Sequence, residues 1–172
     1  MMADRKRFFY DTAGFLIVSI LGCIGHFVYE LSGRNTVAAA VTPVNESTWE
    51  HLKLLFFPFL LYVLWEFFIY GKNIGGFLFS CIIGVLCGML FIPSAFYTYA
   101  AIFGKSGFFV NTAIFFAAVY ISFRVRSDRI KKGVDKNKMR TFPALVIMVC
   151  ITILFVGFTF FPPDSPLFKS PV

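Results

Sequence analysis

The sequence predicts an all-α integral membrane protein, a bundle of about five transmembrane helices with its N-terminus inside and its C-terminus outside. The first observation is composition: 58% of the 172 residues are hydrophobic and only 15% are charged, with a mean hydropathy of +0.78. Soluble domains have about 45–50% apolar and about 25% charged residues. The second is a series of long apolar runs, and the third is the grouping of basic residues beside them. A multi-pass protein of the cell membrane is expected, with the lipid bilayer as its partner.

Five segments approach the length of about 20 mainly apolar residues that a spanning helix needs. The expected spans of this single domain, residues 1–172, are 12–31, 51–70, 74–93, 107–124 and 142–161. Residues 94–107 end in the turn Gly104–Gly107, and the sequence does not decide whether they cross, re-enter or lie at the interface. The proline-rich tail FFPPDSPLFKSPV, residues 160–172, is expected to be non-helical and to lie along the outer surface.

The first span carries two ionisable residues near its outer end. His26 and Glu30 are four residues apart and therefore share one helix face. The connection that follows, SGRNTVAAAVTPV, is mainly small and apolar. Such a connection is expected to dip into the membrane, where protein groups must satisfy its backbone.

The second span begins with the motif NESTWEHLK. Its STWE portion is typical of a capping box, with Ser47 as N-cap and Glu50 three residues later. Lys53 is placed to pair with Glu50 at i+3. Helix initiation does not explain His51, nor why Glu46 and Glu50 occur together at a spacing at which they repel.

These polar residues are predicted to lie in one layer at the outer surface, and two interpretations remain open. One is a site for zinc or another divalent metal, with His26, Glu30 and His51 as ligands and Glu46 or Glu50 as ligand or general base. It would make the chain a membrane-embedded hydrolase or a metal-binding protein. The other is a structural hydrogen-bonded cluster. The remaining polar members of the layer are Arg34, Asn45, Ser47 and Lys53.

Glu66 is a separate case near the inner end of the second span. It lies about 22 Å along the helix from His51, too far to share one ion. It is expected to snorkel to the interface or to pair with Lys72. The functional alternative is a proton or cation relay in a small transporter or channel. Pro58, between the two sites, is expected to kink the helix.

The third span contains a ladder of small residues spaced four apart, Gly76, Ser80, Gly84 and Gly88. Such ladders allow another helix to approach closely. A scaffold that packs through this ladder is therefore a further alternative function. The sequence leaves the oligomeric state open, a homo-oligomer included.

The basic residues determine the predicted orientation. Eight of the sixteen lysines and arginines lie in residues 124–140, and three more lie in DRKR near the start. With the N-terminus inside, twelve of the sixteen are inside, as the positive-inside rule requires. This placement explains the net charge of +7 without a nucleic-acid partner and makes anionic lipids expected partners of Arg124–Arg140.

Two motifs carry a resemblance to a known family. NESTWEHLK and PPDSPLF resemble the recurring segments of a family of small, uncharacterised bacterial multi-pass membrane proteins. This resemblance implies an integral membrane protein and no particular activity. The Ser47-x-x-x-His51 spacing is also similar to that near the zinc ion of the ceramidase and adiponectin-receptor superfamily. Their paired-histidine motif is absent here, so this second likeness concerns site chemistry alone.

Overall fold

The computed structural model describes residues 2–104, 107–133 and 141–170, and within them the chain is helical without strands. Five of its helices are long and apolar enough to cross a membrane, which confirms the predicted fold class to that extent. The helices are α1 (Met2–Leu31), α2 (Thr36–Val41), α3 (Thr48–Ile69), α4 (Phe77–Phe103), α5 (Phe108–Lys132) and α6 (Thr141–Phe160), with 3₁₀ turns η1 (Gly71–Asn73) and η3 (Pro166–Phe168).

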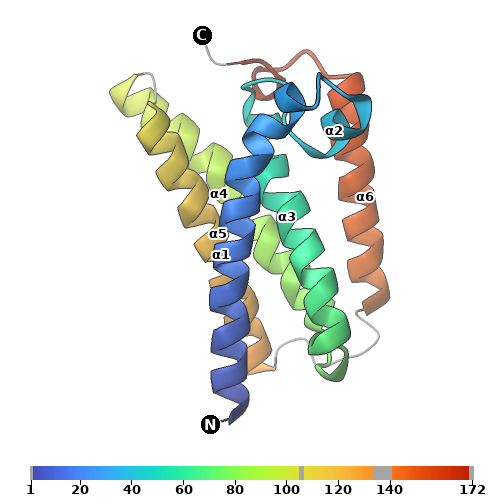
Figure 1. The fold of residues 1–172 in the computed structure, drawn as a ribbon. Helices are drawn as coiled ribbons and strands as arrows, with labels where there is room; N and C mark the ends of the chain where they lie inside the picture. Colours follow the sequence, from blue (N-terminus) through green and yellow to red (C-terminus); the bar gives the residue numbers. More distant parts are fainter. Residues whose placement is uncertain (1, 105–106, 134–140, 171–172) are drawn as a thin grey trace.

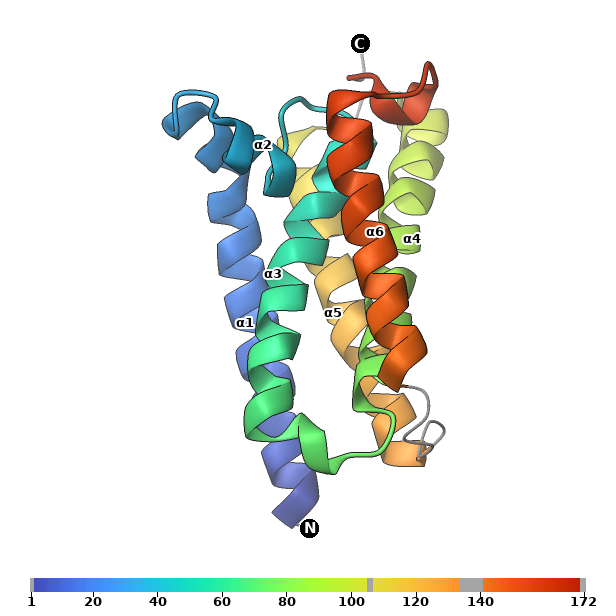
Figure 2. The same ribbon diagram turned by 90° about the vertical axis from the view of Figure 1, so that its right-hand side faces the viewer.

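The long helices run side by side as one bundle, with the two chain termini at opposite ends (Figures 1 and 2). Helix α3 contacts each of the other four long helices and is the centre of the bundle. We call the end that carries α2, the start of α3 and η3 the polar end. The opposite end, which carries the start of α1, η1 and the end of α5, is the basic end.

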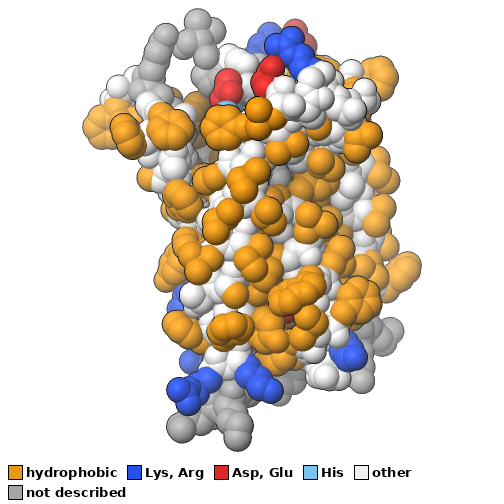
Figure 3. Space-filling model, viewed as in Figure 1, with side chains coloured by type: hydrophobic (Ala, Val, Ile, Leu, Met, Phe, Trp, Pro, Cys, Tyr) orange, Lys and Arg blue, Asp and Glu red, His pale blue; other side chains and the backbone are white. Residues whose placement is uncertain are grey.

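The core is apolar and aromatic, and much of the outer surface is apolar as well. Fully buried side chains of α3, α4 and α6, such as Phe56, Phe59, Ile82 and Phe155, fill the interior. Hydrophobic side chains also cover the middle of the face in Figure 3, whereas most of its charged side chains gather toward the two ends. This is the distribution expected of a chain whose solvent is a bilayer between two aqueous layers.

The small-residue ladder of α4 is a packing surface for α5. A Cβ atom added to Gly88 would lie 2.6 Å from the carbonyl oxygen of Ala118, and one added to Gly84 would lie 3.1 Å from the Cβ of Arg126. The two helices therefore approach at distances that only glycine permits at these positions. The ladder acts within the chain, as the sequence predicts for a helix-packing face.

The region of uncertain assignment, residues 94–107, belongs largely to α4. The helix continues through Pro93 to Phe103, so its second half is an extension of the third span rather than a separate interfacial helix. The Ser94 hydroxyl donates to the carbonyl oxygen of Leu90 across this turn. Lys105 and Ser106 lie outside the described residues.

The C-terminal tail folds back over the polar end. Residues 161–170 contain one short 3₁₀ turn, η3, and are otherwise non-helical, as predicted. The ring of Phe168 lies 5.0 Å from that of Trp49 and 5.4 Å from that of Phe158. These aromatic contacts hold the tail against the first turn of α3.

Candidate metal site

Helix α3 begins with the cap that the sequence predicts. Ser47 is the N-cap, and its hydroxyl accepts a hydrogen bond from the Glu50 amide at 3.3 Å. The reciprocal half of the capping box is different. The Glu50 carboxylate accepts from the amide of Val44, and the side chain of Asn45 accepts from the amide of Ser47 instead. Asn45 therefore supplies the second cap, in an Asx turn.

Lys53 and Glu50 form a buried ion pair at the polar end. Their Nζ–Oε2 distance is 2.7 Å, and their side chains are 0% and 3% exposed. The Lys53 ammonium also lies 2.9 Å from the carbonyl oxygen of Ala39 and 2.5 Å from the hydroxyl of Thr159, and it reaches Thr42 O at 3.3 Å. The predicted pairing is confirmed, and it has a role that the sequence did not reveal. It satisfies the backbone of the apolar connection and ties α2, α3 and α6 together.

Glu50 has no carboxylate oxygen free of protein partners. Oε2 accepts from Lys53 and from the Val44 amide. Oε1 lies 3.2 Å from the Thr159 hydroxyl, whose proton it shares with the carbonyl oxygen of Phe155 at 2.7 Å, and the side chain is 3% exposed. A general base needs a lone pair directed at the reacting water. The position of Glu50 is that of a structural anchor.

Three side chains from three different segments converge at the same end. His26 of α1, Glu46 of the connection and His51 of α3 each offer a ligand atom, and these atoms all lie within 4.8 Å of one another. The Glu46 Oε2 atom is 3.4 Å from Nε2 of His51 and 3.8 Å from Nε2 of His26. The two imidazole rings meet edge to face, with centroids 5.3 Å apart. We call this group the His–Glu triad.

The orientation of His51 is fixed by a backbone contact. Its Nδ1 atom lies 2.9 Å from the carbonyl oxygen of Ser47, one turn earlier in the chain. A carbonyl oxygen only accepts hydrogen bonds, so Nδ1 must carry the proton. In the neutral ring, Nε2 then has the free lone pair, directed at Glu46. A histidine that ligates a metal has this arrangement, with its other ring nitrogen donating to a carbonyl or carboxylate oxygen.

The triad is open to solvent. The side chain of Glu46 is 67% exposed, and those of His26 and His51 are 36% and 27% exposed. An ion held by these three groups would keep at least one coordination position for water. Metal sites with three protein ligands and one open position are typical of catalytic zinc, whereas structural zinc sites are closed by four.

The structure places Glu30 and Arg34 outside the triad. The Glu30 carboxylate pairs with Arg34 at 3.3 Å, and both side chains are mainly exposed. Arg34 has a positive φ of 62°, in the short turn before α2. The side chain of Asn35 then caps α2 by accepting from the Val37 amide. Although Glu30 shares a helix face with His26, its carboxylate is thus directed along the helix toward the turn.

Glu66 lies near the basic end and has a partner that sequence reasoning missed. Arg126 of α5 binds both of its carboxylate oxygens, with Nη1–Oε2 at 2.5 Å and Nη2–Oε1 at 3.3 Å. The expectation that Glu66 snorkels or pairs with Lys72 is therefore wrong, because its side chain is 1% exposed. Asp11 of α1 is a second partner of Arg126.

Arg126 was expected to face the membrane surface as part of the basic cluster. The fourth span was predicted to end at residue 124, but α5 continues as a helix to Lys132. This extension turns Arg126 into the bundle, where its guanidinium also lies 4.9 Å from the ring of Phe123. The signal that could have located it is the position of Arg126 two residues beyond the predicted fourth span, with the carboxylates of Asp11 and Glu66 near the same ends of the first two spans. Residues 134–140 of the cluster lie outside the described residues.

The fold and its sites define a class of protein: a small chain that is helical over its described residues, with five potential membrane spans among them, an ion-pair network near each end and a His–Glu triad at one end. The profile of the Family of unknown function (DUF6512) matches residues 2–172, so the chain belongs to this family. Membership agrees with the resemblance to an uncharacterised family and assigns no activity. Searches among curated proteins and among solved structures gave no match.

Proposed function

We propose that the chain is a multi-pass membrane protein that binds a divalent metal ion, with zinc as the best fit, through His26, Glu46 and His51. The observation that carries the proposal is the Nδ1 hydrogen bond of His51 to the Ser47 carbonyl. It sets the Nε2 lone pair opposite a carboxylate at 3.4 Å. A lone pair and an anion repel each other at this distance unless a cation or a second proton lies between them.

Two of the three ligand distances in the triad fit a tetrahedral ion, and the ligand atoms of the two histidines lie within 4.8 Å of each other. Bonds of about 2.0–2.2 Å at tetrahedral angles place neighbouring ligand atoms about 3.3–3.5 Å apart. The His51–Glu46 separation of 3.4 Å lies in this range, and the His26–Glu46 separation of 3.8 Å is slightly wider. Because Glu46 is on an exposed connection, its side chain can move the few tenths of an ångström that the second contact needs. Two imidazoles and one carboxylate are a donor set suited to zinc.

The ligand set differs from the one expected from sequence in one place. Glu46 takes the position that helical spacing suggested for Glu30, and Glu50 is committed to Lys53. Ser47 contributes to the proposed site through its backbone carbonyl oxygen, which orients His51. The Ser47 hydroxyl is used for another purpose, because it caps α3. The likeness to the zinc-dependent membrane hydrolases is thus limited to spacing.

Hydrolysis is the second candidate function, and the open coordination position favours it. A bound divalent ion lowers the pKa of its water enough to generate hydroxide near neutral pH. The proposed general base Glu50 is engaged elsewhere, so the geometry supports metal binding further than it supports catalysis. The relay alternative has less support, since both oxygens of Glu66 are bound by Arg126.

The proposed orientation follows from the charges. The basic end carries the clusters that the positive-inside rule places in the cytoplasm. The His–Glu triad would then face the opposite side of the cell membrane. Fusion of a reporter enzyme to either terminus tests this, because the two termini lie at opposite ends of the bundle (Figure 1).

The metal proposal is tested by elemental analysis of the purified protein after zinc loading and dialysis. Wild type is expected to hold one zinc ion per chain, and Glu46→Gln and His51→Ala are expected to lose it. Glu30→Gln is the matched control, since it removes the charge of a carboxylate near the triad that does not belong to it. Loss of an outer-shell partner costs about 10–100-fold in metal affinity, and loss of a ligand should exceed this.

Cobalt substitution gives an independent reading of the same site. Tetrahedral Co²⁺ bound by imidazole and carboxylate has visible absorption bands that octahedral aqueous Co²⁺ lacks. Wild type and Glu30→Gln should show these bands, and Glu46→Gln should not. Equal zinc in all variants, or none in wild type, would leave the triad as a structural hydrogen-bonded cluster.

A further inference from the structure

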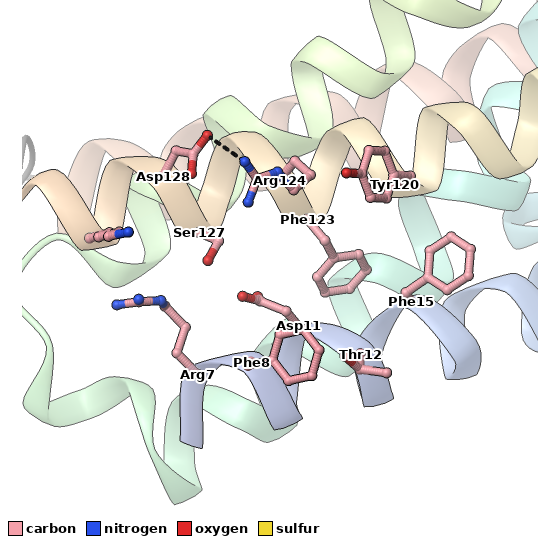
Figure 4. A pocket seen from close by; sticks show the side chains of 11 residues that line it. Arg7, Phe8, Asp11, Thr12, Phe15, Tyr120, Phe123, Arg124, Ser127 and Asp128 are labelled. Carbon is pink, nitrogen blue, oxygen red and sulfur yellow. Dashed lines mark ion pairs between the residues drawn. The ribbon is translucent and has the colours of Figure 1, made fainter. Parts of the chain in front are cut away.

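A cavity of about 620 Å³ lies between α1 and α5 at the basic end, remote from the His–Glu triad (Figure 4). Its residues are drawn from the two helices alone. Basic and other polar groups gather at one end of the lining, and aromatic rings gather at the other. The lining consists of Arg7, Phe8, Asp11, Thr12, Phe15, Tyr120, Phe123, Arg124, Ser127, Asp128 and Lys131.

We propose that this cavity binds the phosphate headgroup of an anionic phospholipid. Arg7 and Arg124 would contact the phosphate, the Ser127 hydroxyl would donate to it, and Phe15 and Tyr120 would pack against the first part of an acyl chain. Arginine is suited to this role because its planar guanidinium binds phosphate oxygens in pairs. Basic pockets between transmembrane helices on the cytoplasmic side are recognised sites for such headgroups.

The charges of the cavity favour one anion. Both acids of the lining are already paired with arginines: Asp11 with the buried Arg126, and Asp128 with Arg124 at 3.5 Å. Arg126 in turn binds Glu66, behind the cavity wall. The lining with these two groups holds four cationic side chains against three carboxylates. One formal positive charge remains, which one phosphodiester neutralises.

The Arg124–Asp128 pair is one that a phosphate can displace. Both of its side chains are about half exposed, at 57% and 46%. Exposed ion pairs of this kind contribute little to stability, because water screens them and both side chains lose freedom in forming them. A phosphate that enters from the bilayer can therefore replace the carboxylate at Arg124 without breaking the buried network beside it.

The position of the cavity selects a lipid over a soluble phosphate. It lies within two helices that are long and apolar enough to span the membrane. Leu16 and Phe116, one helical turn beyond Thr12 and Tyr120 on the side away from Arg7, are 53% and 37% exposed, so an apolar chain leaving the cavity stays in contact with apolar surface. A free phosphate would use the basic end of the lining and none of the aromatic end.

Native mass spectrometry of the protein released from mixed detergent–lipid micelles tests the proposal. Wild type should retain one phosphatidylglycerol at collision energies that remove phosphatidylcholine. The double variant Arg7→Gln/Arg124→Gln should lower phosphatidylglycerol retention at least tenfold. Arg5→Gln/Lys132→Gln is the matched control: it removes the same charge from exposed residues at the same end, outside the lining. It should retain the lipid as wild type does.

The other outcomes overturn the proposal in distinguishable ways. An equal loss in both double variants would mean general attraction to a basic surface. Equal retention of phosphatidylcholine would mean an aromatic groove without headgroup recognition, and displacement by millimolar inorganic phosphate would mean an anion site that does not require a lipid. If the double variant melts early, Arg124→Lys replaces it, which keeps the charge and removes the paired geometry. It should lower retention by a smaller factor, and retention equal to wild type would contradict the role of Arg124.

Discussion

Arg126 of α5 and Glu66 of α3 form a two-point ion pair inside the bundle, and neither side chain is more than 1% exposed. Asp11 of α1 binds the same guanidinium, so one cation joins three helices. Taking these charges out of water is costly, and the pairing offsets this cost only if all three partners are present. The network therefore fixes which faces of α1, α3 and α5 meet.

Replacing one partner of this network should destabilise the protein strongly. Glu66→Leu leaves the guanidinium with one carboxylate, and Arg126→Met leaves two carboxylates without their cation. Loss of one partner of a buried pair costs about 3–5 kcal/mol. Thermal unfolding in detergent should show an early transition for each single variant and a partial recovery in Glu66→Leu/Arg126→Met. Independent, additive effects in this double-mutant cycle would argue against a direct pair.

The polar end offers a second buried pair whose loss should not affect metal binding. Lys53→Met removes the cation that binds the backbone of the connection and the Glu50 carboxylate. We expect a loss of stability of about 3–5 kcal/mol with one zinc ion still bound in the folded fraction. Loss of zinc in a folded Lys53→Met protein would mean that the two groups form one site.

The hydroxyl and the backbone carbonyl of Ser47 have different roles, and one substitution can separate them. Ser47→Ala removes the hydroxyl that accepts from the Glu50 amide and leaves the carbonyl that orients His51. Stability should fall by about 1 kcal/mol, measured by thermal unfolding. Zinc affinity, measured by competition with a chelating dye, should remain close to that of wild type. A large loss of affinity would indicate a hydroxyl that contacts the metal.

Replacing glycine by alanine should have opposite effects on stability at Gly88, which lies in the α4–α5 contact, and at Gly157 of α6, which does not. Gly88→Ala places a methyl group against the Ala118 carbonyl and the Ser122 hydroxyl, and overpacking costs about 1–3 kcal/mol. A Cβ added at Gly157 in α6 meets nothing within 4 Å beyond its own helix backbone among the described residues, so Gly157→Ala should stabilise the helix by up to about 1 kcal/mol. Melting temperatures of the two variants should move in opposite directions. A stable Gly88→Ala protein would mean that the helices can separate without loss.

The fold could be predicted from local features, and the sites only in part. Apolar runs located the five long helices, and the capping box located the start of α3. Partners far apart in the chain have no local signal, so Arg126 was placed with the exposed basic cluster. Glu30 shows the same limit within one helix. The i,i+4 spacing does place Glu30 and His26 on one helix face. The Glu30 carboxylate nevertheless pairs with Arg34, in the turn that follows α1, and not with the triad. His26 and His51 meet because α1 and α3 pack together. The spacing of residues within either helix could not predict that contact.

The order of the network partners along the chain has a consequence for biosynthesis. Arg126 follows Glu66 by 60 residues and Asp11 by 115. Both carboxylates therefore leave the ribosome before their common cation is synthesised. A chain arrested after α4 would hold two uncompensated acids at membrane depth, a costly arrangement that favours retention by the insertion machinery or degradation. The fourth long helix, α5, therefore brings the cation that neutralises the carboxylates of α1 and α3.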